Sequence, residues 1–249
     1  MKVDLKRELQ GIYAIAKKDV RIYYLKGPVL IFGILFPFFL FLAFSVGRNL
    51  PPHALVPGMI SLTIFFTSSS VTPVIAPWER RTKTFERLIS TPVSLHSVLI
   101  GDILSGLLFG IFLVLIPIIL GILLFGVGII SVNALIISIP LSAFCFASLG
   151  TLFSAIPTDT PSEIMTLANL VRLPLIFISG VFIPLEQLPV WGQIIAALSP
   201  LTYAHNLNRC AFEGYVGHSW TINVVILLCF TIFLFVAALV SHKKTLERE

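Results

Sequence analysis

The stretch VLIGDILSGLLFGIFLVLIPIILGILLFGV, residues 98–127, decides the fold class of this chain. Its one charged side chain is Asp102, and the other positions are apolar, small or hydroxyl residues. About 20 apolar residues in a helix cross the roughly 30 Å hydrocarbon layer of a membrane. The run is therefore long enough to span a bilayer, either tilted or with its first turns projecting into the cytoplasm.

The composition of the whole chain agrees with a membrane-spanning fold. Of its 249 residues, 57% are hydrophobic and 12% are charged, and the mean hydropathy is +0.98. Soluble domains carry about 25% charged residues. A β-barrel would show short segments of alternating polarity, which this sequence lacks. The sequence therefore predicts an all-α integral membrane protein.

Six apolar stretches predict six transmembrane helices. Together they form a transmembrane domain over residues 28–240, between an N-terminal segment, 1–27, and a short tail, 241–249. The six predicted spans are 28–47, 54–76, 98–127, 132–156, 164–183 and 220–240.

Lysine and arginine indicate how the spans are oriented. Segment 1–27 holds seven of these cations, the loop 78–97 holds four and the tail holds three, which is 14 of the 17 in the chain. Six spans place these three regions on one side, and the positive-inside rule makes that side cytoplasmic. We therefore expect a multi-pass protein of the cell membrane (plasma or inner), with both termini in the cytoplasm. The loop 157–163 should lie on the same side, although it holds no cation.

Two further segments show helical patterns outside the spans. In segment 1–27, apolar residues recur at helical spacing and the cations lie mostly elsewhere on the helix, which predicts an amphipathic helix in the membrane interface. The extracytoplasmic segment 184–219 contains two short apolar patterns, 188–198 and 201–213, separated by Ser199–Pro200. They predict two re-entrant helices, with an ordinary surface loop as the alternative that their apolar character disfavours.

Arg172 is the exceptional charge within the predicted spans. It lies about nine residues into the fifth span, where a charge costs at least about 2.5 kcal/mol on the insertion scale. Glu163 is nine residues away, about 13 Å along a helix, which is too far for direct pairing. Arg172 faces either a translocation path or a hydrogen-bonding partner between helices.

The charged stretch PWERRTKTFERLISTP, residues 77–92, interrupts the apolar chain. Phe85, Leu88 and Ile89 share one side of a possible helix, and Glu79 and Lys83 form a favourable i, i+4 pair. This pattern fits a short cytosolic helix that docks into a protein partner. It also fits a basic loop that only sets the topology.

The chain lacks motifs for catalysis or metal binding. It contains no Gly-Lys dipeptide, and therefore no phosphate-binding loop for ATP. It also contains no His-Glu-x-x-His or Gly-x-Ser-x-Gly motif, and its three cysteines lack metal-site spacing. We predict no catalytic residue, no metal site and no cofactor bound by this chain. The scarcity of acids in the spans also disfavours a proton- or sodium-coupled carrier.

Two segments resemble a known family. ERRTKTFERLISTPVSLHSVLIGDIL, residues 79–104, is similar to the segment after the second span of ABC-2 type permeases. FISGVFIPLEQLPVWGQIIAALSPLTYAHNLNR, residues 177–209, is similar to their second hallmark, a Ser-Gly, Pro, Leu-Pro-x-Trp run followed by Pro-Leu-Thr-Tyr. The similarity is greatest to daunorubicin-resistance and nodulation-factor export permeases. Two departures are Phe85, where Leu or Trp often occurs, and Asp102, where many members have Lys.

The resemblance implies partners and roles for particular residues. A homodimer would surround one path, and a separate pair of cytoplasmic ATPase subunits would bind ATP and Mg²⁺. The segment 77–97 would contain the coupling helix, spans two and five would border the path, and segment 184–219 would cap its exit. The implied coupling residues are Glu79, Arg80, Arg81, Lys83, Phe85, Glu86, Arg87, Leu88, Thr91 and Pro92. The implied path residues are Phe65, Phe66, Asn169, Arg172 and Phe177, and the implied gate residues are Pro184, Leu188, Pro189, Trp191, Pro200 and Tyr203.

The resemblance therefore implies the permease subunit of an ATP-driven exporter for hydrophobic or amphipathic cargo, such as drugs (multidrug resistance) or lipids. Membrane lipid is an expected partner and nucleic acid is not. An exporter of lipo-oligosaccharide or polysaccharide is the alternative. A stand-alone carrier or channel, and a membrane-embedded enzyme, are less consistent with the motifs.

Overall fold

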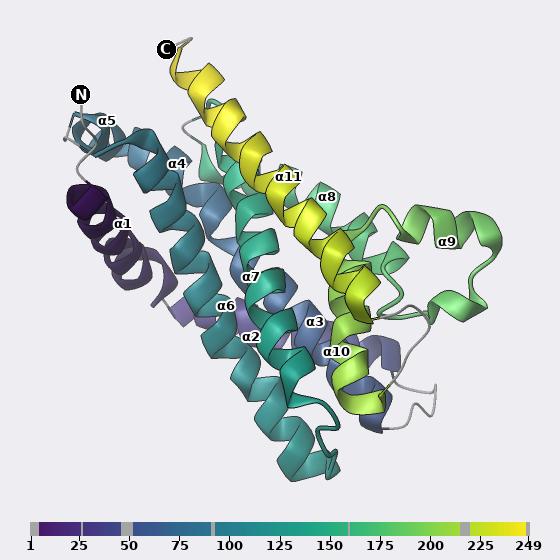
Figure 1. Cartoon of the computed structure of the whole chain (residues 1–249). Helices are drawn as coiled ribbons and strands as arrows, with labels where there is room; N and C mark the ends of the chain where they lie inside the picture. Colours follow the sequence, from purple (N-terminus) through teal and green to yellow (C-terminus); the bar gives the residue numbers. More distant parts are fainter. Residues whose placement is uncertain are drawn as a thin grey trace.

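The computed structural model describes residues 5–25, 27–45, 52–90, 93–158, 160–214 and 220–247. Within these ranges every regular element is a helix (Figure 1). Most are α-helices, η1 is a π-helix and η2 a 3₁₀-helix. In chain order they are α1 (Leu5–Asp19), η1 (Val20–Tyr24), α2 (Gly27–Ser45), α3 (Pro52–Ser70), α4 (Thr72–Arg81), α5 (Thr84–Ile89), α6 (Leu95–Phe125), α7 (Val132–Ser154), α8 (Pro161–Ile178), η2 (Leu185–Gln187), α9 (Val190–Ala196), α10 (Pro200–Glu213) and α11 (Trp220–Leu246).

Among the described residues, five stretches of helix are long and apolar enough to cross a membrane. They are His53–Arg81, Leu95–Phe125, Val132–Ser154, Pro161–Ile178 and Trp220–Leu246. These stretches match the second to sixth predicted spans, which confirms the all-helical membrane class. The first predicted span, 28–47, coincides with the 19-residue α2. Because α2 is not one of the five, a sixth crossing stays a prediction.

The second span is interrupted at Val71, between α3 and α4. Pro73 lies two residues further on, and a proline lacks the N–H group that would otherwise bond to the carbonyl four residues earlier, here Ser69. On the α3 side, Thr67 and Ser69 donate their hydroxyls to the carbonyls of Thr63 and Phe65, at 2.6 and 2.5 Å. Such side-chain bonds to the preceding turn tend to bend helices. The second span therefore consists of two helices, α3 and α4, joined at Val71.

Two glycines let neighbouring helices approach this interruption. A Cβ atom at Gly106 of α6 would lie 2.9 Å from the carbonyl oxygen of Ser68. A Cβ atom at Gly150 of α7 would lie 1.8 Å from Oγ1 of Thr72. Small residues at such positions are the usual means by which membrane helices pack backbone to backbone. The interruption is therefore held between α6 and α7.

The segments predicted to be cytoplasmic gather at one end of the bundle. Helix α5, the start of α1 and the end of α11 lie toward the upper left in Figure 1. Arg80 Nη1 at the end of α4 donates to the Ile156 carbonyl at 3.2 Å, and Thr245 Oγ1 of α11 donates to the Ala155 carbonyl at 2.8 Å. The short α7–α8 loop thus lies at the same end as the basic segments. Which side of the membrane this end occupies stays a prediction.

The segment after α8 folds into the short helices η2, α9 and α10. Helix α9 exposes apolar side chains, with Val190 74% and Trp191 67% exposed. Helix α10 is almost wholly buried, and Asn208 donates to Ser61 Oγ of α3 at 2.9 Å and accepts from Ser138 Oγ of α7 at 2.8 Å. Two serine hydroxyls, one on α3 and one on α7, thus provide hydrogen-bond partners for the buried amide of Asn208 on α10. The re-entry of α10 into the membrane remains a prediction.

Candidate translocation cavity and ATPase-coupling surface

Helices α4 and α5 form a cationic elbow, residues 78–90. Lys83 has φ 53°, a left-handed conformation that turns the chain between the two helices. Thr84 Oγ1 donates to the Glu79 carbonyl at 3.2 Å and closes the turn. The side chains of Arg81, Lys83 and Arg87 are exposed. The elbow therefore presents three cations to its surroundings.

Other predicted coupling residues lie differently. Glu79 is only 4% exposed, and Arg80 is half-buried against the α7–α8 loop. Leu88 is half-buried on α5. The remaining four predictions, Thr91, Pro92 and the side chains of Phe85 and Glu86, lie outside the described part of the chain. The coupling role of all these residues stays a prediction.

Helix α1 holds the elbow at its start. Lys18 Nζ forms an ion pair with Glu79 and lies 3.1 Å from Asp19 Oδ1. Burial by itself would lower the pKa of Lys18, but the carboxylates of Asp19, Glu79 and Asp102 outweigh it and keep that pKa above its ordinary value. Burial also raises the pKa of Asp19. Three buried carboxyl groups thus surround one ammonium where α1, η1, α4 and α6 meet.

Helix α1 also holds the segment that follows the elbow. Glu8 accepts hydrogen bonds from Ser97 Oγ and, at 2.7 Å, from Ser94 Oγ. These bonds lower the pKa of Glu8. Ser94 also caps α6, accepting from Ser97 N at 3.2 Å. The amphipathic pattern predicted α1 but carried no signal for these contacts.

A cavity of about 610 Å³ opens between η1, α2, α3, α4 and α8. Three of the five predicted path residues line it: Phe66, Asn169 and Arg172. The other two do not. Phe65 is buried edge-on against Phe146, with ring centroids 4.8 Å apart, and Phe177 is 46% exposed on α8. The described lining residues are Tyr23, Val29, Gly33, Phe36, Phe66, Ser70, Val71, Val74, Trp78, Pro161, Ser162, Met165, Asn169, Arg172 and Leu173.

Arg172 lies in the wall of this cavity and is 1% exposed. Its Nη2 donates to the Ser69 carbonyl at the end of α3, and its Nη1 donates to Asn169 Oδ1 at 3.3 Å. Glu163 instead accepts from Thr158 Oγ1 at 2.9 Å. Arg172 thus bonds between helices and also lines a cavity, and its place on a translocation path stays a prediction.

The sequence comparison decides the family. Residues 10–212 match the family described as ABC-2 type transporter, which is most of the chain. The chain belongs to this family. Its five apolar helices and the elbow after the second span are therefore those of an ABC-2 membrane protein.

Three curated proteins are similar to this ABC-2 chain. ABC transporter G family member 20 of Dictyostelium discoideum is 30% identical over 200 residues, 78% of the chain and 27% of the relative. Nodulation protein J of Rhizobium leguminosarum bv. viciae is 29% identical over 110 residues, 44% of the chain and 42% of the relative. Daunorubicin resistance ABC transporter permease protein DrrB1 of Streptomyces coeruleorubidus is 29% identical over 84 residues, 34% of the chain and 28% of the relative. The chain thus spans less than half the length of each.

The predicted gate residues of the ABC-2 chain lie away from the described lining of this cavity. Trp191 is exposed on α9, whereas Pro200 and Tyr203 are buried on α10, and Tyr203 donates to the Ala197 carbonyl at 2.9 Å. Pro184, Leu188 and Pro189 flank η2 and precede α9. Their gating role stays a prediction.

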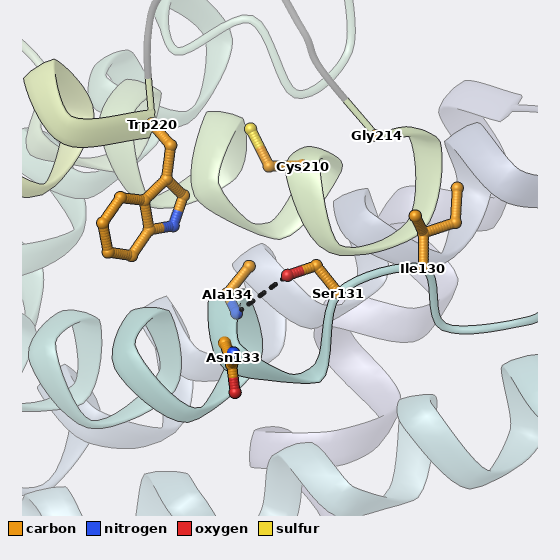
Figure 2. A pocket seen from close by; sticks show the side chains of 7 residues that line it. All are labelled: Ile130, Ser131, Asn133, Ala134, Cys210, Gly214 and Trp220. Atoms are coloured by element: carbon orange, nitrogen blue, oxygen red, sulfur yellow. Dashed lines mark hydrogen bonds between the residues drawn. The ribbon is translucent and has the colours of Figure 1, made fainter.

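A second cavity, of about 440 Å³, lies where the end of α10 meets the start of α7. Figure 2 shows Ser131 capping α7, its Oγ accepting from Ala134 N at 3.4 Å, with Cys210 and Trp220 on neighbouring helices. None of the described lining residues is charged. This cavity therefore offers less for recognition than the one around Arg172.

Proposed function

We propose that this chain is the membrane-spanning permease subunit of an ATP-driven exporter. The observation that carries the proposal is the exposed cationic elbow of an ABC-2 chain, whose start and following segment are both held by α1. Two copies of a cytoplasmic ATPase would dock at the elbow and bind ATP and Mg²⁺, since this chain lacks a phosphate-binding motif. A second copy of the chain would complete the path, within the lipid of the cell membrane.

Helix α4 supplies a route from docking to transport. Its end carries Arg81 of the elbow, while Val74 and Trp78 on the same helix line the Arg172 cavity. Because α4 is separated from α3 at Val71, a displacement of the elbow can move α4 without moving all of α3. Such a two-state shift would change the cavity between inward-open and outward-open forms.

The cavity favours a hydrophobic or amphipathic cargo. Its volume of about 610 Å³ lies within the range of about 300–1,000 Å³ of small-molecule sites. Lipo-oligosaccharide is the second candidate, because Tyr23, Phe36, Phe66 and Trp78 provide rings on which sugars can stack. The width of the path in the dimer would decide between them.

Charge reversal at the elbow tests the docking proposal. We expect Arg81→Glu combined with Arg87→Glu to reduce, by about ten-fold, the ATPase subunit that co-purifies with the tagged chain. Truncating one partner of a hydrogen-bonded charge pair buried at an interface costs about 2–5 kcal/mol, and a loss of about 1.4 kcal/mol already weakens binding ten-fold. ATP-dependent transport in vesicles should fall in parallel.

The matched control is Lys243→Glu combined with Lys244→Glu, which reverses two exposed cations of α11. We expect this variant to retain the ATPase. Equal retention by both variants would show that docking does not use the elbow.

Cysteine labelling tests the orientation. In a chain whose Cys145, Cys210 and Cys229 are replaced by alanine, cysteine is introduced as Gly128→Cys or Lys243→Cys. These positions lie in the α6–α7 loop and near the end of α11. The positive-inside rule predicts that a membrane-impermeant maleimide labels intact cells only at position 128. Labelling of position 243 without permeabilisation would reverse the proposed topology.

A further inference from the structure

The Arg172 cavity combines one buried cation with apolar and aromatic walls. Of the described residues that line it, Arg172 is the single charged one. We infer that this cavity binds an anionic amphiphile, whose carboxylate or phosphate contacts Arg172 and whose apolar part contacts the surrounding walls. The inference deepens the proposed function by naming the class of molecule that the permease accepts.

The guanidinium has donors available for such a ligand. A guanidinium carries five N–H groups, and Arg172 bonds once through each terminal nitrogen, to Ser69 and Asn169. Its Nε has no hydrogen-bond partner among the residues that the structure describes. Both bonded acceptors are neutral, so neither balances the charge.

Arg172 also lacks a protein counter-ion within the described part of the chain. No ion pair there includes it, and Glu163 of the same helix bonds to Thr158 instead. An unpaired buried charge is costly, and a bound anion would offset that cost. Planar bidentate pairing makes arginine well suited to carboxylate and phosphate.

The other walls suit an apolar tail. Phe66 and Val71 are buried in the wall, and Phe36 and Leu173 are each 40% exposed at its margin. These margins belong to α2 and α8. An amphiphile could therefore enter between these two helices from the lipid while its head group reaches Arg172.

Binding of a matched pair of probes tests the inference without any ATPase. The purified chain is placed in phosphatidylcholine nanodiscs and titrated with dansyl-undecanoate or its uncharged methyl ester, with empty discs as reference. We expect the native chain to bind the carboxylate more tightly than the ester. Arg172→Gln should weaken carboxylate binding by about ten-fold, because a hydrogen bond to a charged group contributes about 1.5 kcal/mol or more, and leave ester binding unchanged.

Three further variants separate recognition from folding. Arg172→Lys keeps the cation and should keep most of the preference for the carboxylate. Val74→Phe fills the cavity and should weaken both probes alike. Lys243→Gln removes an exposed cation, 72% of whose side chain is accessible, and should change neither. Equal binding of the two probes by the native chain, or equal loss of both in Arg172→Gln, would overturn the inference.

Two sources can supply the anionic head group, the bilayer itself or a cytosolic amphiphile. Adding phosphatidylglycerol to the discs distinguishes them. Competition with the probe in the native chain, but not in Arg172→Gln, identifies a membrane lipid; absence of competition identifies a cytosolic amphiphile. Because no transport is measured, failure of probe binding leaves the exporter proposal intact, and failure of elbow docking leaves this inference intact.

Discussion

Replacing Gly106 with valine is expected to lower the stability of the folded chain strongly. A Cβ atom at this position would lie 2.9 Å from the Ser68 carbonyl oxygen, 3.1 Å from Ala147 Cβ and 3.1 Å from Thr72 Cγ2. The first of these is backbone, so it cannot rotate away. Overpacking typically costs 1–3 kcal/mol, and a branched side chain against three neighbours should cost about 3 kcal/mol or more.

The measurement is the melting temperature and the monodisperse fraction of the purified protein. A loss of about 3 kcal/mol lowers the melting temperature of a chain of this length by about 6 °C or more. Gly128→Val is the control, since beyond its two chain neighbours no atom of the described residues lies within 4 Å of a Cβ there. If Gly106→Val melted like the native chain, the close packing of α6 on the α3–α4 interruption would be wrong.

The second large effect concerns Lys18. Lys18→Met keeps the apolar stem but leaves Asp19, Glu79 and Asp102 buried without their cation. Removing one partner of a buried pair costs about 3–5 kcal/mol. Because the Lys18 side chain is 26% exposed, water screens part of its charge. We therefore expect the free energy of unfolding to fall by about 3 kcal/mol. Thermal unfolding in detergent measures it.

Glu79→Gln serves as the matched comparison. It removes one of three carboxylates, and Lys18 keeps Asp19 at 3.1 Å, so the expected loss is only about 1 kcal/mol. If both variants lost the same free energy of unfolding, the interpretation that three buried carboxyl groups depend on the single cation of Lys18 would be wrong.

The same cluster predicts a pH dependence. Burial raises the pKa of Asp19 above its unfolded value of about 3.9. Such a carboxyl stabilises the fold fully below the unfolded pKa, and that stability is lost as pH rises through the folded pKa. Without Lys18 the folded pKa of Asp19 should rise further. Lys18→Met should therefore regain stability on acidification from neutral pH to about pH 5, more than the native chain does.

Much of the helical layout could be read from the sequence. The apolar run 98–127 became α6 (Leu95–Phe125), and the run 132–156 became α7 (Val132–Ser154). The helix after Ser199 also began at Pro200 and ended before Gly214. These outcomes follow from local causes, since hydrophobic length, proline and glycine act within one or two turns.

The site was predicted less completely, because its geometry depends on which helices meet. The pattern of residues 77–92 treated Glu79 as part of a charged surface, whereas the fold buries it against Lys18, 61 residues away. Phe65 and Phe66 are adjacent, but only Phe66 lines the cavity. A helix turns by about 100° per residue, so neighbours can face different partners.

By itself, the sequence determined an all-helical membrane protein of the ABC-2 family, with a charged elbow after its second span. Apolar length and family motifs are properties of continuous segments, and they require no knowledge of neighbours. Only the tertiary structure decided that α1 binds the start of the elbow and the segment that follows it, and that Arg172 lines an apolar cavity. Those features arise from contacts such as Arg172 with Ser69, 103 residues apart, which no local pattern encodes.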